Sequence, residues 1–231
     1  MKVEIYSDVA CPWCYIGKRR FERALAAFPG AEGVEVVYRP YQLDPDAPAP
    51  AVPLLEHLAR RFGPQAGGMA GRVVETARGE GIVMDFDRAL AANTLDAHRL
   101  MWHAEREHGP AVQRAVAEGL FRAHFAEGAD VGDPGVLAEV AARAGMDPAR
   151  VRDFLASGEG TREVREEIGH ARRLGVSAVP TFVIDGRYAV QGAQPASAFL
   201  QALETVARES GEALGDGDPG DEACADGSCA V

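Results

Sequence analysis

The sequence predicts an α/β fold in which a large all-helical insertion separates the βαβ and ββα halves of a four-stranded sheet. Three observations support this prediction: strand-like residues open the chain, helical patterning fills its middle, and strand-like residues return near its end. The 231 residues are enough for one large domain with a sizeable insertion. We therefore divide the chain into a sheet-bearing domain of residues 1–45 and 175–208, a helical insertion domain of residues 46–174, and an acidic, flexible tail of residues 209–231.

The N-terminal part of the chain predicts a strand–helix–strand unit. Residues 3–8 alternate between apolar and polar side chains, as a half-buried strand does. A helix over residues 12–28 ends at a Pro-Gly pair, and the β-rich residues 34–39 form a second strand. So short a connection through a helix is typical of two parallel strands in a βαβ unit.

The spacing of apolar residues predicts helices over almost the whole middle of the chain. Two Asp-Pro pairs, at residues 133–134 and 147–148, each place an N-cap before a proline in the first helical turn. The predicted helices of the insertion cover residues 53–62, 66–80, 87–108, 110–126, 134–144, 148–157 and 161–174.

The C-terminal part predicts a β-hairpin followed by a helix. The β-rich residues 181–184 and 187–190 flank Asp185-Gly186, which fits a two-residue type I′ turn. A last helix covers residues 195–208. We expect these strands to join the first two in one sheet, with one of the two outer helices on each side.

Charge and hydropathy exclude several classes of protein. The net charge is −11, but seven of the 35 acidic residues lie from Glu209 onward, which leaves 28 acidic against 24 basic residues in the body. The body therefore has no basic excess for nucleic acid, and the chain has no apolar run long enough to span a membrane. Residues 1–7 are too short and polar for a signal peptide, so we expect a cytoplasmic protein with catalytic rather than structural disulfides.

Two cysteines lie where the first strand gives way to the first helix, in Cys11-Pro12-Trp13-Cys14. One helical turn of separation lets the two sulfurs form a short disulfide, and Pro12 suits the first turn of a helix. The helix N-terminus favours the thiolate form of Cys11, which is a nucleophile. Cys14 shares a helical stripe with Phe21, so we expect Cys14 to be buried and Cys11 exposed. This pattern predicts redox chemistry in which Cys11 attacks and Cys14 resolves.

Two segments far apart in the chain resemble a known family. Residues 7–14 (SDVACPWC), residues 175–182 (GVSAVPTF) and the helical insertion between them resemble the DsbA-like branch of the thioredoxin superfamily, and more closely its FrnE-like cytoplasmic members. The resemblance implies a thioredoxin-type fold and a thiol–disulfide oxidoreductase that acts on protein or peptide thiols and disulfides. It also implies that Val179–Pro180 is a cis peptide beside Cys11, and that the backbone of Val179 pairs with an extended substrate.

Three further residues are candidates for the surroundings of the dithiol. Trp13 packs beside the site or contacts peptide substrates. Asn93 lies in a segment that resembles part of the family's insertion, which places it near the cleft, whereas its alternative is a polar helix face. Asp8 is a candidate to assist proton transfer to Cys14, or else a polar residue at the strand end.

The tail carries a second pair of cysteines, Cys224 and Cys229, so that all four cysteines of the chain fall in two close pairs. We hypothesise that this auxiliary redox pair exchanges electrons with Cys11 and Cys14; the alternative is a tail without a role. No histidine lies near either pair in the sequence, and we predict no metal site.

The reaction stays open between three classes. The first is an oxidoreductase or isomerase of protein disulfides that needs no cofactor beyond its own redox-active disulfide, with glutathione as a candidate redox partner. The second is a glutathione-dependent isomerase or transferase of the kappa or 2-hydroxychromene-2-carboxylate isomerase type, which acts on small aromatic substrates. Those relatives usually have Ser where Cys11 stands. The third is a chaperone-like binder. Monomer and homodimer are both open, as is the direction of electron flow.

Overall fold

The computed structural model describes residues 1–211, which contain a four-stranded sheet of order β2-β1-β5-β6. Strand β1 (Lys2–Ser7) pairs in parallel with β2 (Glu35–Pro40) and antiparallel with β5 (Thr181–Ile184), which pairs antiparallel with β6 (Tyr188–Gln191). Helix α1 (Pro12–Ala27) connects β1 to β2. The predicted α/β fold, with its βαβ unit and C-terminal hairpin, is therefore confirmed.

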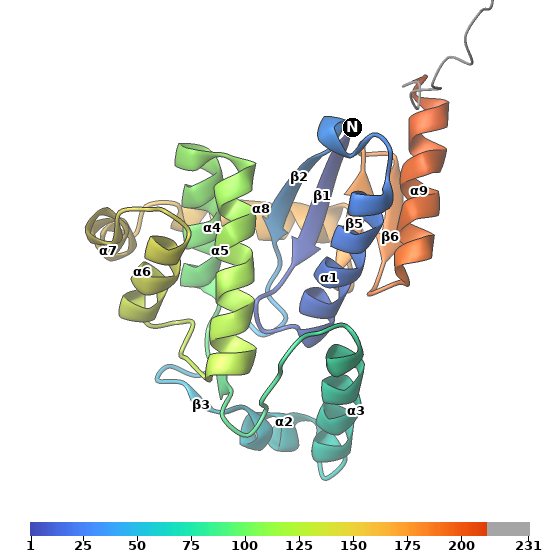
Figure 1. Ribbon diagram of the computed structural model, residues 1–231. Coiled ribbons are helices and arrows are strands. Elements are labelled where there is room, and N and C mark those ends of the chain that lie inside the picture. Colours follow the sequence, from blue (N-terminus) through green and yellow to red (C-terminus); the bar gives the residue numbers. More distant parts are fainter. Residues whose placement is uncertain (212–231) are drawn as a thin grey trace, which may run out of the picture.

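One face of the sheet is covered by α1 and by α9 (Ala196–Glu209), which lie side by side (Figure 1). Their contact is aromatic: the ring of Phe199 packs edge-on against Phe21 of α1 and Phe182 of β5, at centroid distances of 5.7 and 4.5 Å. The expectation of one outer helix on each side of the sheet is therefore wrong.

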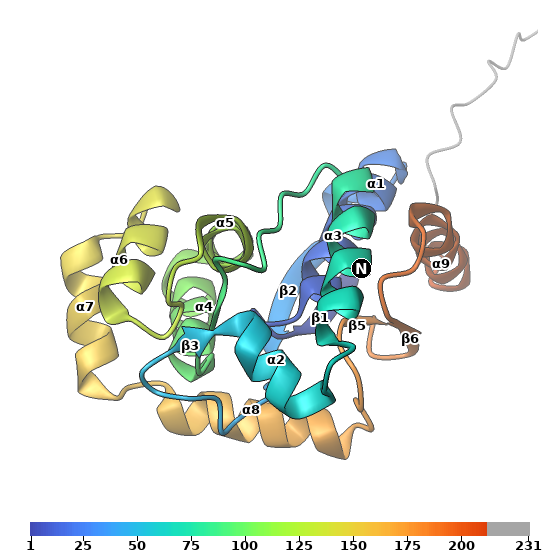
Figure 2. The same cartoon turned by 90° about the horizontal axis from the view of Figure 1, so that it is seen from below.

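The opposite face is covered by α8 (Thr161–Arg173), the last helix of the insertion (Figure 2). Successive side chains of a strand point to opposite faces, so β1 sends Ile5 toward the aromatic core and Tyr6 toward α8. Tyr6 packs there with Ala171 and Val176. The insertion thus completes the sheet's second layer, which the sequence pattern does not reveal.

The rest of the insertion consists mainly of helices, as predicted. Asp133 and Asp147 cap α6 and α7, because their carboxylates accept backbone N–H groups of Val136 (3.0 Å) and Ala149 (2.9 Å). The further helices described are α2 (Leu54–Phe62), α3 (Ala66–Gly79), α4 (Leu95–His108), α5 (Pro110–Arg122), α6 (Pro134–Arg143), α7 (Pro148–Ser157) and the 3-10 turn η1 (Ala31–Gly33).

One predicted helix begins too early, and another changes from an α-helix to a π-helix before its end. Residues 87–94 are not helical; instead β4 (Leu90–Ala91) pairs with β3 (Val52–Pro53). Asp85 caps one turn of chain, since its carboxylate accepts the backbone N–H groups of Asp87 and Arg88, but the turn ends where β4 pairs with β3. The helix predicted over residues 110–126 gives way after Arg122 to a π turn, η2 (Ala123–Glu127).

Helices α2 and α3 lie at the end of the sheet where β1 leads into α1 (Figures 1 and 2). Asp185 and Gly186 have φ angles of 49° and 65°, the positive values that a type I′ turn requires. The predicted loop of two residues is one residue too short, because Ile184 pairs with Tyr188 and leaves residues 185–187 between the strands. Within residues 1–211 no helix is long and apolar enough to cross a membrane. Cys224 and Cys229 lie outside the described residues.

Candidate active site

Cys11 and Cys14 lie at the N-terminal end of α1. Cys11 is the N-cap and Pro12 the first helical residue, as predicted. The backbone N–H of Cys11 donates to the carbonyl of Asp8 (3.0 Å), and the N–H of Cys14 donates to the carbonyl of Cys11 (3.0 Å). Both cysteines are free thiols. The expectation of an exposed Cys11 is wrong, because Cys11 is 5% exposed and Cys14 2%.

A loop from the far end of the chain covers one side of Cys11. The Val179–Pro180 peptide is cis, as the family resemblance implies, and the Cys11 thiol lies 3.7 Å from the carbonyl oxygen of Val179. Gly17 lets α1 and this loop approach each other, since a Cβ there would lie 2.9 Å from Cγ of Pro180. Contact with this loop is one reason for the burial of Cys11.

Burial raises the pKa of the Cys14 thiol well above its usual value, and the neighbouring Cys11 thiol raises it further. Hydrogen bonds with the Ser7 hydroxyl and the Asp8 backbone oppose this effect without cancelling it. Cys14 is therefore a protonated thiol at neutral pH, and it must lose a proton before it can attack a disulfide.

Asp8 is a buried carboxylate three residues before Cys11. It accepts the backbone N–H of Leu43 (2.7 Å), and its Oδ1 lies 3.4 Å from Nε2 of the buried His98. Burial by itself would raise the pKa of Asp8, but His98 and the Leu43 N–H together hold it below the usual value. Asp8 is thus ionised at neutral pH, and its part in proton transfer to Cys14 stays a prediction.

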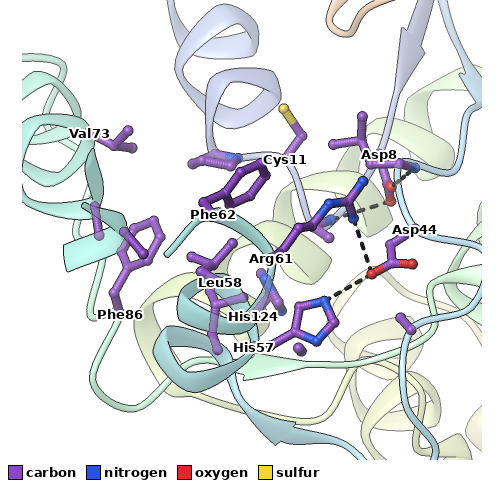
Figure 3. A pocket seen from close by; sticks show the side chains of 18 of the residues that line it. Asp8, Cys11, Asp44, His57, Leu58, Arg61, Phe62, Val73, Phe86 and His124 are labelled. Carbon is purple, nitrogen blue, oxygen red and sulfur yellow. Dashed lines mark hydrogen bonds and ion pairs between the residues drawn. The ribbon is translucent and has the colours of Figure 1, made fainter. Parts of the chain in front are cut away.

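An apolar cavity of about 320 Å³ opens on the other side of Cys11 (Figure 3). Residues of α2, of α3 and of the loops that follow β1 and β2 line it, together with the first residues of α1. Large apolar side chains at its edge are unusually exposed: Trp13 and Phe62 by 42%, Leu43 and Met69 by 41%. Trp13 thus lies beside the dithiol, as the sequence predicts.

Charged groups gather at one side of this cavity. Asp44 accepts from His57 (2.9 Å) and pairs with Arg61 (3.3 Å), and Figure 3 shows this group across the cavity from Val73 and Phe86. No local motif links these residues, because Asp44 lies in a loop and the other two on α2.

The DSBA-like thioredoxin domain family matches residues 2–204, nearly the whole chain. The chain belongs to this family. A crystal structure of the probable DsbA oxidoreductase SCO1869 from Streptomyces coelicolor is 40% identical, with coverage of 100% of this chain and 99% of that one and a TM-score of 0.80.

Two other solved structures are similar in fold alone, at lower identity. One is 2-hydroxychromene-2-carboxylate isomerase, which is 18% identical, with coverage of 92% of this chain and 98% of that one and a TM-score of 0.66. The other is the cytosolic disulfide reductase DsbM from Pseudomonas aeruginosa with GSH, which is 22% identical, with coverage of 90% of this chain and 100% of that one and a TM-score of 0.64. Membership of the DSBA-like family supports thiol–disulfide oxidoreductase activity.

Asn93 of this DSBA-like domain does not line the cavity. Its Oδ1 accepts the backbone N–H of Leu95 (3.0 Å) and Nε2 of Gln42 (3.1 Å), and its Nδ2 donates to the carbonyl of Pro45 (2.8 Å). Asn93 therefore fastens the loop that carries Leu43 and Asp44 to the start of α4, and it acts on the cavity indirectly.

Sequence reasoning missed Gly17 and Ser7. Gly17 had a visible signal, since glycine is disfavoured inside a helix and here it stands one turn after Cys14. Ser7 had none, because its contact with the Cys14 thiol depends on how β1 meets α1 in three dimensions.

Proposed function

We propose that this protein is a thiol–disulfide oxidoreductase of protein or peptide disulfides, with Cys11 as the attacking thiol and Cys14 as the resolving thiol. The observation that supports this most is the position of Cys11. Its sulfur lies at the start of α1 and 3.7 Å from the carbonyl oxygen of Val179, with Cys14 more deeply buried behind it. Membership of the DSBA-like family supports the same reaction class.

The proposed reaction has two exchange steps. The Cys11 thiolate attacks one sulfur of the substrate disulfide, so that a Cys11–substrate disulfide forms and the other substrate sulfur leaves as a thiolate. Cys14 then loses its proton and attacks the Cys11 sulfur, which releases the second substrate thiolate. The substrate disulfide is reduced and the dithiol becomes the Cys11–Cys14 disulfide, which an external dithiol reduces again. The same steps in reverse oxidise a substrate dithiol.

Two neighbours support these steps in the proposal. The backbone of Val179 pairs with an extended substrate segment, in the manner of strand addition, and so holds a substrate sulfur near Cys11. Ionised Asp8, whose backbone bonds to the Cys14 thiol, is placed to take part in removal of its proton.

The test is the reduction of insulin disulfides by dithiothreitol, with the wild type compared with Cys11→Ser. We expect the wild type to accelerate reduction and the variant to match the uncatalysed rate, because a hydroxyl does not replace a thiolate nucleophile. Trp13→Phe, in the same motif, controls for general effects on the site. A Cys11→Ser variant as active as the wild type would show that Cys11 is not the nucleophile.

A second candidate is a glutathione-dependent isomerase or transferase of small aromatic substrates. The apolar cavity beside Cys11 and the fold shared with 2-hydroxychromene-2-carboxylate isomerase favour it. It predicts isomerisation of a small aromatic substrate only when glutathione is present, without any reduction of insulin. Glutathione also serves the first function as a redox partner. When the substrate is reduced, two glutathione molecules reduce the Cys11–Cys14 disulfide and leave as glutathione disulfide; when the substrate is oxidised, glutathione disulfide oxidises the dithiol and leaves as two glutathione molecules.

A further inference from the structure

His124 lies at the inner end of the cavity beside Cys11. It belongs to the π turn η2 that follows α5, and it is completely buried (Figure 3). Among residues 1–211 neither ring nitrogen of His124 has a hydrogen-bond partner. Buried side-chain nitrogens nearly always have a partner, so an unpartnered imidazole that lines a cavity indicates a polar group of a ligand there.

The charge state of His124 defines that polar group. Burial lowers the pKa of His124 to about 4, although the negative charge of Asp8 acts in the opposite direction. The ring is therefore neutral at neutral pH, with one N–H donor and one acceptor nitrogen. Ionised Asp8 lines the same cavity and disfavours an anion, so a neutral hydroxyl fits better than a carboxylate.

The walls define the rest of the ligand. Phe62 and Phe86 present aromatic rings to the cavity, Met69 presents a thioether, and Leu54, Leu58, Ala70 and Val73 add apolar surface. The polar side chains His57 and Arg61 of α2 lie at one side of the cavity, where both are bound to Asp44. Aromatic and thioether groups favour contact with another aromatic ring. A ligand that places an aromatic ring against these walls and a neutral hydroxyl at His124 is a phenol.

We propose that this cavity binds the phenol ring of a tyrosine next to the reacting cysteine of a peptide substrate, with its hydroxyl hydrogen-bonded to His124. The proposal rests on the proposed function, because it adds a preferred sequence to the substrate of Cys11. Cys11 and His124 line the same cavity, so the ring enters while the neighbouring sulfur reaches Cys11. His124 is then a specificity-determining residue.

The experiment compares three disulfide peptides that differ only in having Tyr, Phe or Ala next to the cysteine. For the wild type we expect kcat/KM for the Tyr peptide to exceed that for the Phe peptide by about tenfold, because Phe leaves the imidazole unpaired. In His124→Leu the ratio falls to about 1. In the matched control His103→Leu, which replaces a half-buried imidazole outside the cavity, the preference for Tyr persists. Equal wild-type values for the Tyr and Phe peptides would overturn the proposal.

Binding of p-cresol and toluene, followed by NMR, separates this proposal from the proposed function. We expect tighter binding of p-cresol to the wild type, and no difference between the probes in His124→Leu. Ala70→Phe, which fills the cavity from α3, weakens binding of both and serves if His124→Leu does not fold. If no peptide is reduced but the wild type still binds p-cresol more tightly than toluene, the proposed function is wrong and the phenol site is supported. If p-cresol binds as expected but Tyr and Phe peptides react alike, the ligand is a free phenol and the tyrosine assignment is wrong.

Discussion

The two sides of Cys11 are built differently. On one side the loop of Val179 and Pro180 is packed so closely against α1 that Gly17 has no room for a Cβ. On the other side α2 and α3 leave Phe62 and Met69 about two-fifths exposed around an open cavity. The close side fixes the distance between the Cys11 sulfur and the Val179 carbonyl, and the proposed pairing of an extended substrate with Val179 uses this distance. The open side has free apolar surface, which is suited to selection among substrates.

The largest effect should come from the resolving thiol on the closely packed side. In Cys14→Ser we expect insulin reduction to fall by about 10³-fold, because the Cys11–substrate disulfide forms but is not resolved. Mass spectrometry under non-reducing conditions should show one substrate thiol bound to Cys11. Cys11→Ser in the same preparation should show no such adduct. A Cys14→Ser variant with wild-type turnover would contradict the two-step mechanism.

The second-largest effect should come from the close contact between Gly17 and Pro180. Gly17→Ala forces Pro180 to move, and we expect a loss of about 1–3 kcal/mol in the free energy of unfolding, together with slower insulin reduction. The control is Gly71→Ala on α3, where an added Cβ meets nothing within 4 Å and helix propensity increases stability by about 1 kcal/mol. Guanidinium unfolding measures both. Equal effects of the two substitutions would mean that the contact between Gly17 and Pro180 is not tight in solution.

The difference in the free energy of unfolding between the wild type and Asp8→Asn should depend on pH. The pKa of Asp8 is lowered in the folded state, so the ionised form adds stability that is present above the unfolded pKa of about 3.9 and is lost as the pH falls through the folded value. Asp8→Asn should therefore cost about 1–2 kcal/mol at pH 7, and this difference should shrink below about pH 4. Urea unfolding at several pH values measures it. The exposed Asp153→Asn serves as the control, and a constant difference across this range would contradict the assignment.

The smallest effect on stability should come from the open side. Phe62→Ser and Met69→Ser each replace a side chain that is about two-fifths exposed, so we expect the free energy of unfolding to fall by about 1 kcal/mol or less. The KM for a peptide disulfide with an aromatic neighbour should rise about threefold as apolar contact is lost. Val83→Ser is the control, since Val83 is 71% exposed and lies outside the cavity. An unchanged KM in both variants would show that the cavity does not bind the substrate.

The comparison between the two sides also separates what local sequence can predict from what it cannot. The strand before Cys11, the helix after it, the caps at Asp133 and Asp147 and the turn at Asp185 were all predictable from neighbours in the chain. Each depends on hydrogen bonds or φ angles within a few residues, and those are properties of short peptides. The predicted helix over residues 87–108 began too early, because Leu90 and Ala91 pair with β3, which lies almost 40 residues earlier in the chain.

By itself, the sequence determined the order of strands and helices, the place of the dithiol at a strand-to-helix junction and the burial of Cys14. Only the tertiary structure decided that α1 and α9 share a face, that Cys11 is nearly buried, and that Asn93 holds a loop instead of lining the cavity. The physical reason is distance along the chain. The Cys11 thiol and the Val179 carbonyl are 168 residues apart, and the contact that buries the thiol exists only once the whole sheet has formed.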